Sequence, residues 1–209
     1  MDWDHPEHVF GSSLEPVVLR VLWRTTSSMT GAQVHRLANT GSDQGVRRAL
    51  ERLVEFGIVR SRQAGRAILY SLNREHLLFP AVDGAFRALH PTQSFRTIVQ
   101  EIVTSHFPTD PETVSVALFG SVARGDARPD SDVDLLVIAP DSYSEPAQGV
   151  ADDLRALEPR LGQWVQVYLT DPDRLRHAVE TDDPIVQSFR DDCEQLHGPD
   201  VRTYLQGTR

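Results

Sequence analysis

The segment 119–138, which reads FGSVARGDARPDSDVDLLVI, constrains the fold of this chain more than any other. Apart from Asp134, its last six residues form an apolar run, and residues 114–118 form another just before the segment. Apolar runs of this length between polar turns predict buried strands. Since side chains at positions i and i+2 of a strand point to the same face, Asp132 and Asp134 are expected to lie side by side. The segment therefore predicts two strands with a pair of carboxylates at the start of the second.

This pair of carboxylates indicates a site for a divalent metal and a phosphate. Ionised carboxylates held together repel each other and are costly to remove from water, so such a pair usually holds a cation. Mg²⁺ is the expected ion because it prefers oxygen ligands and substrate phosphates. At the bend after the first strand, Gly120 allows the backbone to approach a phosphate, the Ser121 hydroxyl can donate to it, and Arg124 can add a charge-assisted bond. The structural alternative is a polar hairpin with aspartates as turn formers, which leaves Asp134 unexplained.

In this segment the chain resembles the nucleotidyltransferase superfamily typified by DNA polymerase beta, and within it the minimal nucleotidyltransferases of bacterial and archaeal toxin-antitoxin systems. The residues that carry the resemblance are Gly120, Ser121, Arg124, Gly125, Ser131, Asp132 and Asp134. The resemblance implies Mg²⁺-dependent transfer of a nucleotidyl group from a nucleoside triphosphate (NTP) to a hydroxyl. It assigns catalysis and metal binding to Asp132 and Asp134, and nucleotide binding to Gly120, Ser121, Arg124 and Ser131.

The same resemblance implies a third carboxylate on a later strand, and here the sequence departs from the family pattern. The expected strand, 164–169, alternates so that Gln166 lies between two aromatic residues on its polar face. A neutral amide is a poor substitute for an ionised metal ligand. Asp171 and Asp173 follow, but they are expected to cap and begin the next helix. Two functions stay open: a transferase, or a regulator whose degenerate domain binds nucleotide or dimerises without catalysis.

The first part of the chain predicts a separate winged helix-turn-helix domain. Apolar residues recur at helical spacing in three stretches, and Ser42 and Gly57 are the expected cap and end of the third helix. Two short strands, 58–62 and 67–72, follow and are joined through Gly65. Three helices and a hairpin in this order resemble the bacterial transcription regulators with this fold.

The third helix and the wing are the expected contacts with double-stranded DNA. In this fold the third helix enters the major groove and the wing meets the flanking backbone. The candidates are Gln44, Arg47, Arg48 and Arg52 on the helix and Arg60, Arg62 and Arg66 on the wing. An ordinary solvated face is the alternative, because Glu51 and Glu55 interleave with the arginines.

Charge is divided unevenly along the chain. The net charge of the 209 residues is −9. Residues 1–75 hold ten Arg and eight acidic residues, whereas the remainder holds eleven Arg and twenty-two acidic residues. Only the first part suits a nucleic-acid surface, and the acidic remainder favours a small-molecule or protein acceptor over a long RNA. The single cysteine, Cys193, excludes an intramolecular disulfide and favours a reducing cytoplasm. The sequence has no apolar run long enough to cross a membrane, so no membrane partner is expected.

The sequence as a whole predicts an α+β protein of two domains. A winged helix-turn-helix domain is expected over 1–75, a linker, connector helix or homodimer contact over 76–91, and a nucleotidyltransferase-type mixed sheet flanked by helices over 92–209. The flanking helices include one over 92–105 and one over 146–161. The start of the chain, around His5 and His8, is expected to be disordered. An antibiotic-modifying transferase is a third functional interpretation, disfavoured by the winged-helix pattern.

Overall fold

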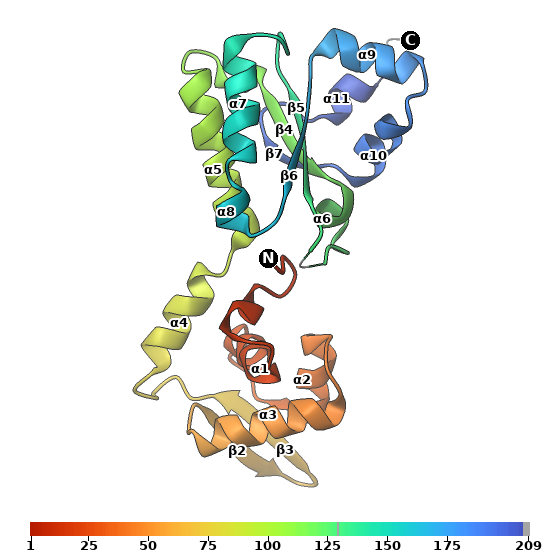
Figure 1. Cartoon of the computed structure of the whole chain (residues 1–209). Coiled ribbons are helices and arrows are strands. Elements are labelled where there is room, and N and C mark those ends of the chain that lie inside the picture. The colour runs from red at the N-terminus through yellow and green to blue at the C-terminus, as the bar shows by residue number, and fades with distance from the viewer. Residues whose placement is uncertain (129, 207–209) are drawn as a thin grey trace. The chain divides into compact units, whose positions relative to one another are not determined.

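The computed structural model describes residues 1–128 and 130–206. The chain forms two compact units, one of His5–His90 and one of Met1–Asp4 together with Pro91–Arg209. Figure 1 traces both units from the N-terminus to the C-terminus. The expected α+β class, with a winged helix-turn-helix followed by a mixed sheet flanked by helices, is confirmed. In the part of the chain that the structure describes, no helix combines the length and apolar character needed to cross a membrane.

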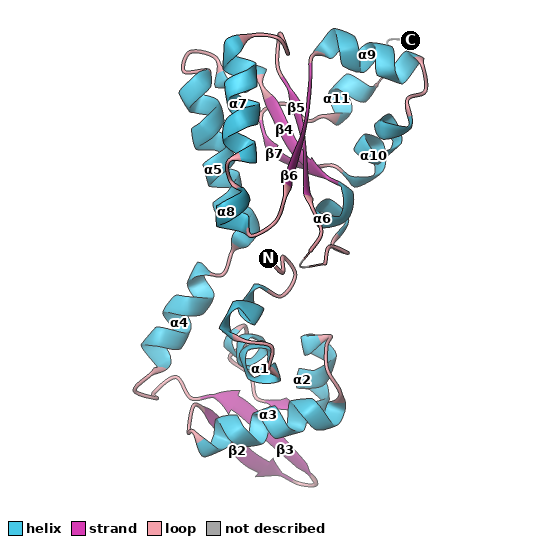
Figure 2. Cartoon of the chain, viewed as in Figure 1, coloured by secondary structure: helices cyan, strands magenta, loops and turns pink. Residues whose placement is uncertain are grey.

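The first unit packs its helices against a small antiparallel sheet. Its elements are the 3₁₀ helix η1 (Pro6–Phe10), α1 (Leu14–Trp23), β1 (Met29–Thr30), α2 (Gly31–Ala38), α3 (Asp43–Glu55), β2 (Val59–Ala64), β3 (Ala67–Leu72) and α4 (Phe79–Ala88). The strand order is β1-β3-β2, so β3 is central (Figure 2). Apolar residues at helical spacing on α1, α2 and α3 form the core with the buried residues of β2 and β3.

Local capping signals fix the helix boundaries of this unit. The Thr30 side chain and Gln33 form a reciprocal capping box at the start of α2. The Ser42 hydroxyl accepts a hydrogen bond of 3.1 Å from the Gly45 amide at the start of α3, as expected. Gly57 and Gly65 adopt φ of 72° and 61°, conformations that favour glycine, and they end α3 and turn the wing.

The first residues of this unit are ordered, so the expected disorder around His5 and His8 is wrong. They belong to or adjoin η1, and the two imidazole rings stack with their centroids 5.3 Å apart. Glu7 is 1% exposed and accepts a hydrogen bond from the guanidinium of Arg20 on α1. The pairing of a buried carboxylate with an arginine satisfies the charge and ties η1 to the helix.

The second unit is a four-stranded mixed sheet covered by helices on both faces. Its elements are α5 (Pro91–His106), η2 (Pro111–Thr113), β4 (Ser115–Phe119), α6 (Gly120–Arg124), β5 (Val133–Ile138), α7 (Glu145–Arg155), α8 (Glu158–Leu161), β6 (Val165–Thr170), α9 (Pro172–Glu180), α10 (Pro184–Asp192), β7 (Glu194–His197) and α11 (Arg202–Leu205). The strand order is β6-β5-β4-β7, with β5 parallel to β6 and antiparallel to β4. Helices α5 and α7 cover one face, and α9, α10 and α11 cover the other (Figure 2).

The helix expected over 146–161 is instead two helices, α7 and α8, interrupted after Arg155. Pro159 lies in the first turn of α8. Proline has no amide hydrogen and its ring collides with the preceding turn, so it kinks or breaks a helix that continues through this position.

Residues Met1–Asp4 pack on the second unit even though the next residues belong to the first. The indole ring of Trp3 lies edge-on against Phe95 of α5, with the ring centroids 5.6 Å apart. The indole nitrogen donates a hydrogen bond of 2.9 Å to the side-chain oxygen of Gln163, just before β6. The N-terminal segment is therefore anchored by both an aromatic contact and a polar one.

Candidate functional site

The bend after β4 and the carboxylates of β5 form one site. Phe119, the last residue of β4, pairs in register with Asp134 on β5. Gly120 follows with φ of 71°, and a Cβ atom at this position would lie 2.6 Å from the Asp134 Oδ2 atom. A Cβ atom there would have to displace the carboxylate, so glycine is favoured both by the backbone conformation and by the position of Asp134. The Gly-Ser bend and Asp134 therefore lie next to each other at the end of β4.

The surroundings of Asp134 disfavour its ionised form. Partial burial and the neighbouring charge of Asp132 raise the pKa of Asp134, and the Arg124 guanidinium acts in the opposite direction. A raised carboxyl pKa means that the ionised form is destabilised where it stands. A divalent cation bound by both carboxylates would relieve this repulsion, so the chemistry of the two residues fits such an ion.

Gln166 occupies the place beside the two carboxylates. It pairs in register with Asp134 across the parallel strands β5 and β6, and its amide nitrogen donates a hydrogen bond of 2.5 Å to the Asp132 Oδ2 atom. The neighbours on its face of β6, Trp164 and Tyr168, are exposed, as the alternation predicts. Among residues 1–128 and 130–206, no three His, Cys, Asp or Glu side chains gather as a metal cluster. The site therefore presents two carboxylates, one of them held by an amide donor.

Asp171 and Asp173 do not supply the third carboxylate, and their predicted capping role is confirmed. Asp171 accepts a hydrogen bond of 2.9 Å from the Arg174 amide at the start of α9 and another of 2.7 Å from the Ser142 hydroxyl. Asp171 follows the end of β6, five residues beyond Gln166, and at 3.3 Å per strand residue this is about 16 Å along the strand. Asp173 pairs with a neighbouring arginine on the surface of α9.

The loop before β5 is fixed by a residue that the sequence does not single out. The Ser131 hydroxyl accepts a hydrogen bond of 2.9 Å from the Arg128 amide and so closes the turn of this loop. The amide nitrogen of Gln163 donates to the Ser131 carbonyl at 2.8 Å and to the Arg128 carbonyl at 3.4 Å. Gln163 is 6% exposed, and its oxygen accepts the Trp3 hydrogen bond. No motif marks Gln163, because its partners are distant in the chain.

Arg124 ends α6 at the edge of the site. Its guanidinium donates to Asp192 at 2.7 Å and to Asp126 at 3.3 Å. Helix α6, which begins with Gly120 and Ser121, has five residues, so its macrodipole is weak. The second unit thus brings together Gly120, Asp132 and Asp134, with Arg124 close enough to affect the charge of Asp134.

The candidate DNA-binding side chains lie on α3 and on the wing formed by β2 and β3, and all seven residues are exposed. Three of them form ion pairs: Arg47 with Asp43, Arg52 with Glu15 and Arg60 with Glu75. Arg48, Arg62 and Arg66 have no acidic partner within the described ranges. Unpaired guanidinium groups are free to bind phosphates, so these three are the most available contacts on this surface.

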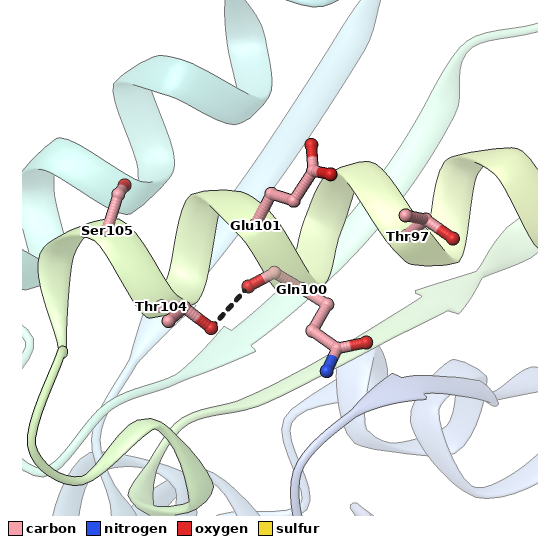
Figure 3. Close-up of a pocket in the computed structure, with 5 residues that line it drawn as sticks. All are labelled: Thr97, Gln100, Glu101, Thr104 and Ser105. Carbon is pink, nitrogen blue, oxygen red and sulfur yellow. Dashed lines mark hydrogen bonds between the residues drawn. The ribbon is translucent and has the colours of Figure 1, made fainter.

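A shallow depression on α5 is separate from this site. It is lined by Thr97, Gln100, Glu101, Thr104 and Ser105, all from the one helix (Figure 3). The Thr104 hydroxyl donates to the Gln100 carbonyl at 2.8 Å, one turn earlier. That bond is internal to the helix, and none of the five residues belongs to the site at β4 and β5.

The two units correspond to two known classes of domain: a DNA-binding regulator domain and a nucleotidyltransferase domain. The model of the penicillinase repressor family matches residues 11–115, which is half of the chain, and the model of the nucleotidyltransferase domain matches residues 95–185. The chain belongs to the penicillinase repressor family and carries a nucleotidyltransferase domain after the winged helix. Searches of curated proteins and of solved structures gave no match.

Proposed function

We propose that this protein is a DNA-binding nucleotidyltransferase that transfers a nucleotidyl group from an NTP to a hydroxyl acceptor. The observation that carries the proposal is the direct contact of the Gly120 bend with Asp134, next to Asp132. This arrangement places a glycine-serine bend suited to a phosphate beside a carboxylate pair in which burial and the charge of Asp132 raise the pKa of Asp134. In the reaction the acceptor oxygen forms a bond to the α-phosphorus, the bond to pyrophosphate breaks, and the hydroxyl proton leaves to solvent or a carboxylate.

Each residue of the site has a role in this proposal. Asp132 and Asp134 would hold Mg²⁺, which when bound neutralises phosphate charge and stabilises the attacking and leaving oxygens. Ser121 and the backbone at Gly120 would bind the phosphates that leave, and Arg124 would add positive charge at the same end. Ser131 would act through the backbone of its loop, because its hydroxyl already closes the turn.

A nucleotide-sensing regulator without transfer is the second candidate, and Gln166 favours it. Its amide donates to Asp132 at the place where the family pattern has a third carboxylate. Such a bond occupies one acceptor site of the Asp132 carboxylate and leaves the acceptor hydroxyl without a carboxylate on that side. In this version the same site binds a single metal with its nucleotide, and the result is a change in DNA binding.

The first unit would place this activity at a DNA site. Unpaired arginines on α3 and the wing supply the phosphate contacts, while residues 76–209 hold eleven Arg against twenty-two acidic residues. An acidic unit repels a long polyanion, so we infer that the acceptor is a protein or small molecule rather than a long RNA. A toxin-antitoxin or defence role in the cytoplasm fits a transferase tethered to DNA.

Label transfer distinguishes the two candidates. The protein is incubated with Mg²⁺, each NTP labelled at the α-phosphate, and cell extract, and the wild type is compared with the double variant Asp132→Asn, Asp134→Asn. Asp173→Asn is the matched control, since this side chain is 85% exposed on α9. Transfer lost only in the double variant supports the enzyme. Nucleotide binding with no labelled product supports the sensor, and absence of NTP binding by the wild type contradicts both.

A change at Gln166 tests whether its amide limits nucleotidyl transfer. Gln166→Glu places a third carboxylate beside Asp132 and Asp134 while keeping the length of the side chain. If the amide limits transfer, this variant gives more labelled product and a stronger dependence on Mg²⁺. If wild-type transfer is already efficient and the variant is slower, the amide is part of a working site and the sensor is contradicted.

A further inference from the structure

A group of one arginine and two aspartates stands at the phosphate end of the site. The Arg124 guanidinium donates to the Asp192 carboxylate at 2.7 Å and to the Asp126 carboxylate at 3.3 Å. The two acids differ in their surroundings, since the side chain of Asp192 is 14% exposed and that of Asp126 is 63% exposed. The shielded pair of Arg124 with Asp192 is therefore the stronger of the two.

Core packing positions Asp192, although the Arg124 side chain is 44% exposed. Asp192 is the last residue of α10, whose Phe189 is fully buried. The Phe189 ring stands edge-on against Phe119, with the centroids 5.0 Å apart and the planes at 88°. Phe119 directly precedes Gly120, so one aromatic contact joins α10 to the bend that touches Asp134. The position of Asp192 relative to the bend is thus set by core packing.

We propose that Asp192 is a positioning residue that holds the Arg124 guanidinium at the phosphate end of the nucleotide site. This inference rests on the proposed function, because it takes the triphosphate of a bound NTP as the ligand of Arg124. A guanidinium has five N–H donors in a rigid fork. Asp192 and Asp126 each accept one of them, so donors remain for phosphate oxygens. Asp192 lies beyond residue 185, where the match to the nucleotidyltransferase model ends.

The physical reason is preorganisation. A free arginine side chain on a five-residue helix samples many rotamers, and these must be given up when a phosphate binds. A fixed guanidinium has already lost that freedom during folding. The contrary effect is competition, in which Asp192 neutralises Arg124 and weakens its hold on the phosphates. The two effects predict opposite changes in affinity when the charge of Asp192 is removed.

The test measures nucleotide affinity by titration calorimetry on the full chain in the presence of Mg²⁺. The four NTPs are compared first. The diphosphate and monophosphate of the NTP that binds most tightly are then measured. The variants are Asp192→Asn, Arg124→Gln and the two combined. Asp191→Asn is the matched control, because this neighbouring carboxylate accepts a hydrogen bond from Gln187 on its own helix. Thermal unfolding of each variant shows whether it is folded.

The positioning role predicts that Asp192→Asn weakens NTP binding by about three- to tenfold, the effect expected for one ordinary hydrogen bond. Arg124→Gln weakens it at least as much, the combined variant is no weaker than Arg124→Gln, and monophosphate binding and Asp191→Asn are unaffected. Unchanged or tighter NTP binding by Asp192→Asn overturns the inference and leaves the proposed function intact. If Asp192→Asn does not fold, an NTP affinity of Arg124→Gln equal to that of the wild type also overturns the inference. If the wild type binds no NTP, the proposed function fails and this inference fails with it.

Discussion

Trp3→Phe gives a direct test of the way the N-terminal segment supports the site. Phenylalanine keeps an aromatic ring to pack against Phe95 but removes the indole donor of the 2.9 Å bond to Gln163. Gln163 is 6% exposed, so its side-chain oxygen would lose a partner in a place with little water. A buried acceptor left without a hydrogen bond costs about 1–3 kcal/mol. For a unit of this size the loss corresponds to a fall of roughly 3–10 °C in the midpoint of unfolding.

The assay is amide hydrogen exchange of the full chain, because it separates the stability of the two units. Trp3→Phe should lower the protection of the amides of β5 and β6 and leave β2 and β3 unchanged. Trp23→Phe is the matched control, since its indole donates at 2.8 Å to Asp83 in the first unit. Asp83 keeps its bond from Arg87, so that change should be smaller and confined to the first unit. Unaltered protection of β5 and β6 in Trp3→Phe would show that Gln163 does not depend on the indole.

Three further changes test other parts of the molecule. Asp134→Asn should raise the unfolding temperature of the ligand-free protein near neutral pH, because it removes a carboxylate whose pKa is raised by burial and by its neighbour; a lower temperature contradicts the electrostatic account. Burial opposes the shift, but hydrogen bonding lowers the pKa of Asp171 below its ordinary value. The ionised cap therefore stabilises the protein at pH values above the ordinary carboxyl pKa, and this stability is lost as the pH falls through the lowered pKa. Unfolding midpoints of Asp171→Asn and the wild type should therefore differ at neutral pH and converge in acid, and a constant difference refutes this. In a DNA-binding assay at increasing salt, Arg48→Ala should weaken binding and lower the slope of log affinity against log salt concentration by about one. Arg52→Ala should have a smaller effect, because the wild-type Arg52 side chain already pairs with Glu15. Equal effects of the two variants contradict this order.

The elements of both units follow from short-range signals in the sequence. Alternation with a period of two places Asp134 and Gln166 on the same face of the sheet, and both strands form as predicted. Ser42 and Asp171 cap their helices through bonds to amides three residues away. Such signals are readable because backbone geometry connects residues only a few positions apart. The N-terminal residues and the helix expected over 146–161 are exceptions. The first gives no periodic signal because its start is charged, and in the second the helical spacing of apolar residues continues across the break before Pro159.

The sequence by itself determined that a Gly-Ser bend and two aspartates meet in a mixed sheet, and that a winged helix precedes it. Only the tertiary structure decided which side chains control those groups. Gln166 and Asp132 are 34 residues apart, Arg124 and Asp192 are 68 apart, and Trp3 and Gln163 are 160 apart. These pairs depend on the order of the strands and on how α10 and the N-terminal segment pack against the sheet. No periodicity or motif in the chain records such partners, because packing brings them together only after the local elements have formed.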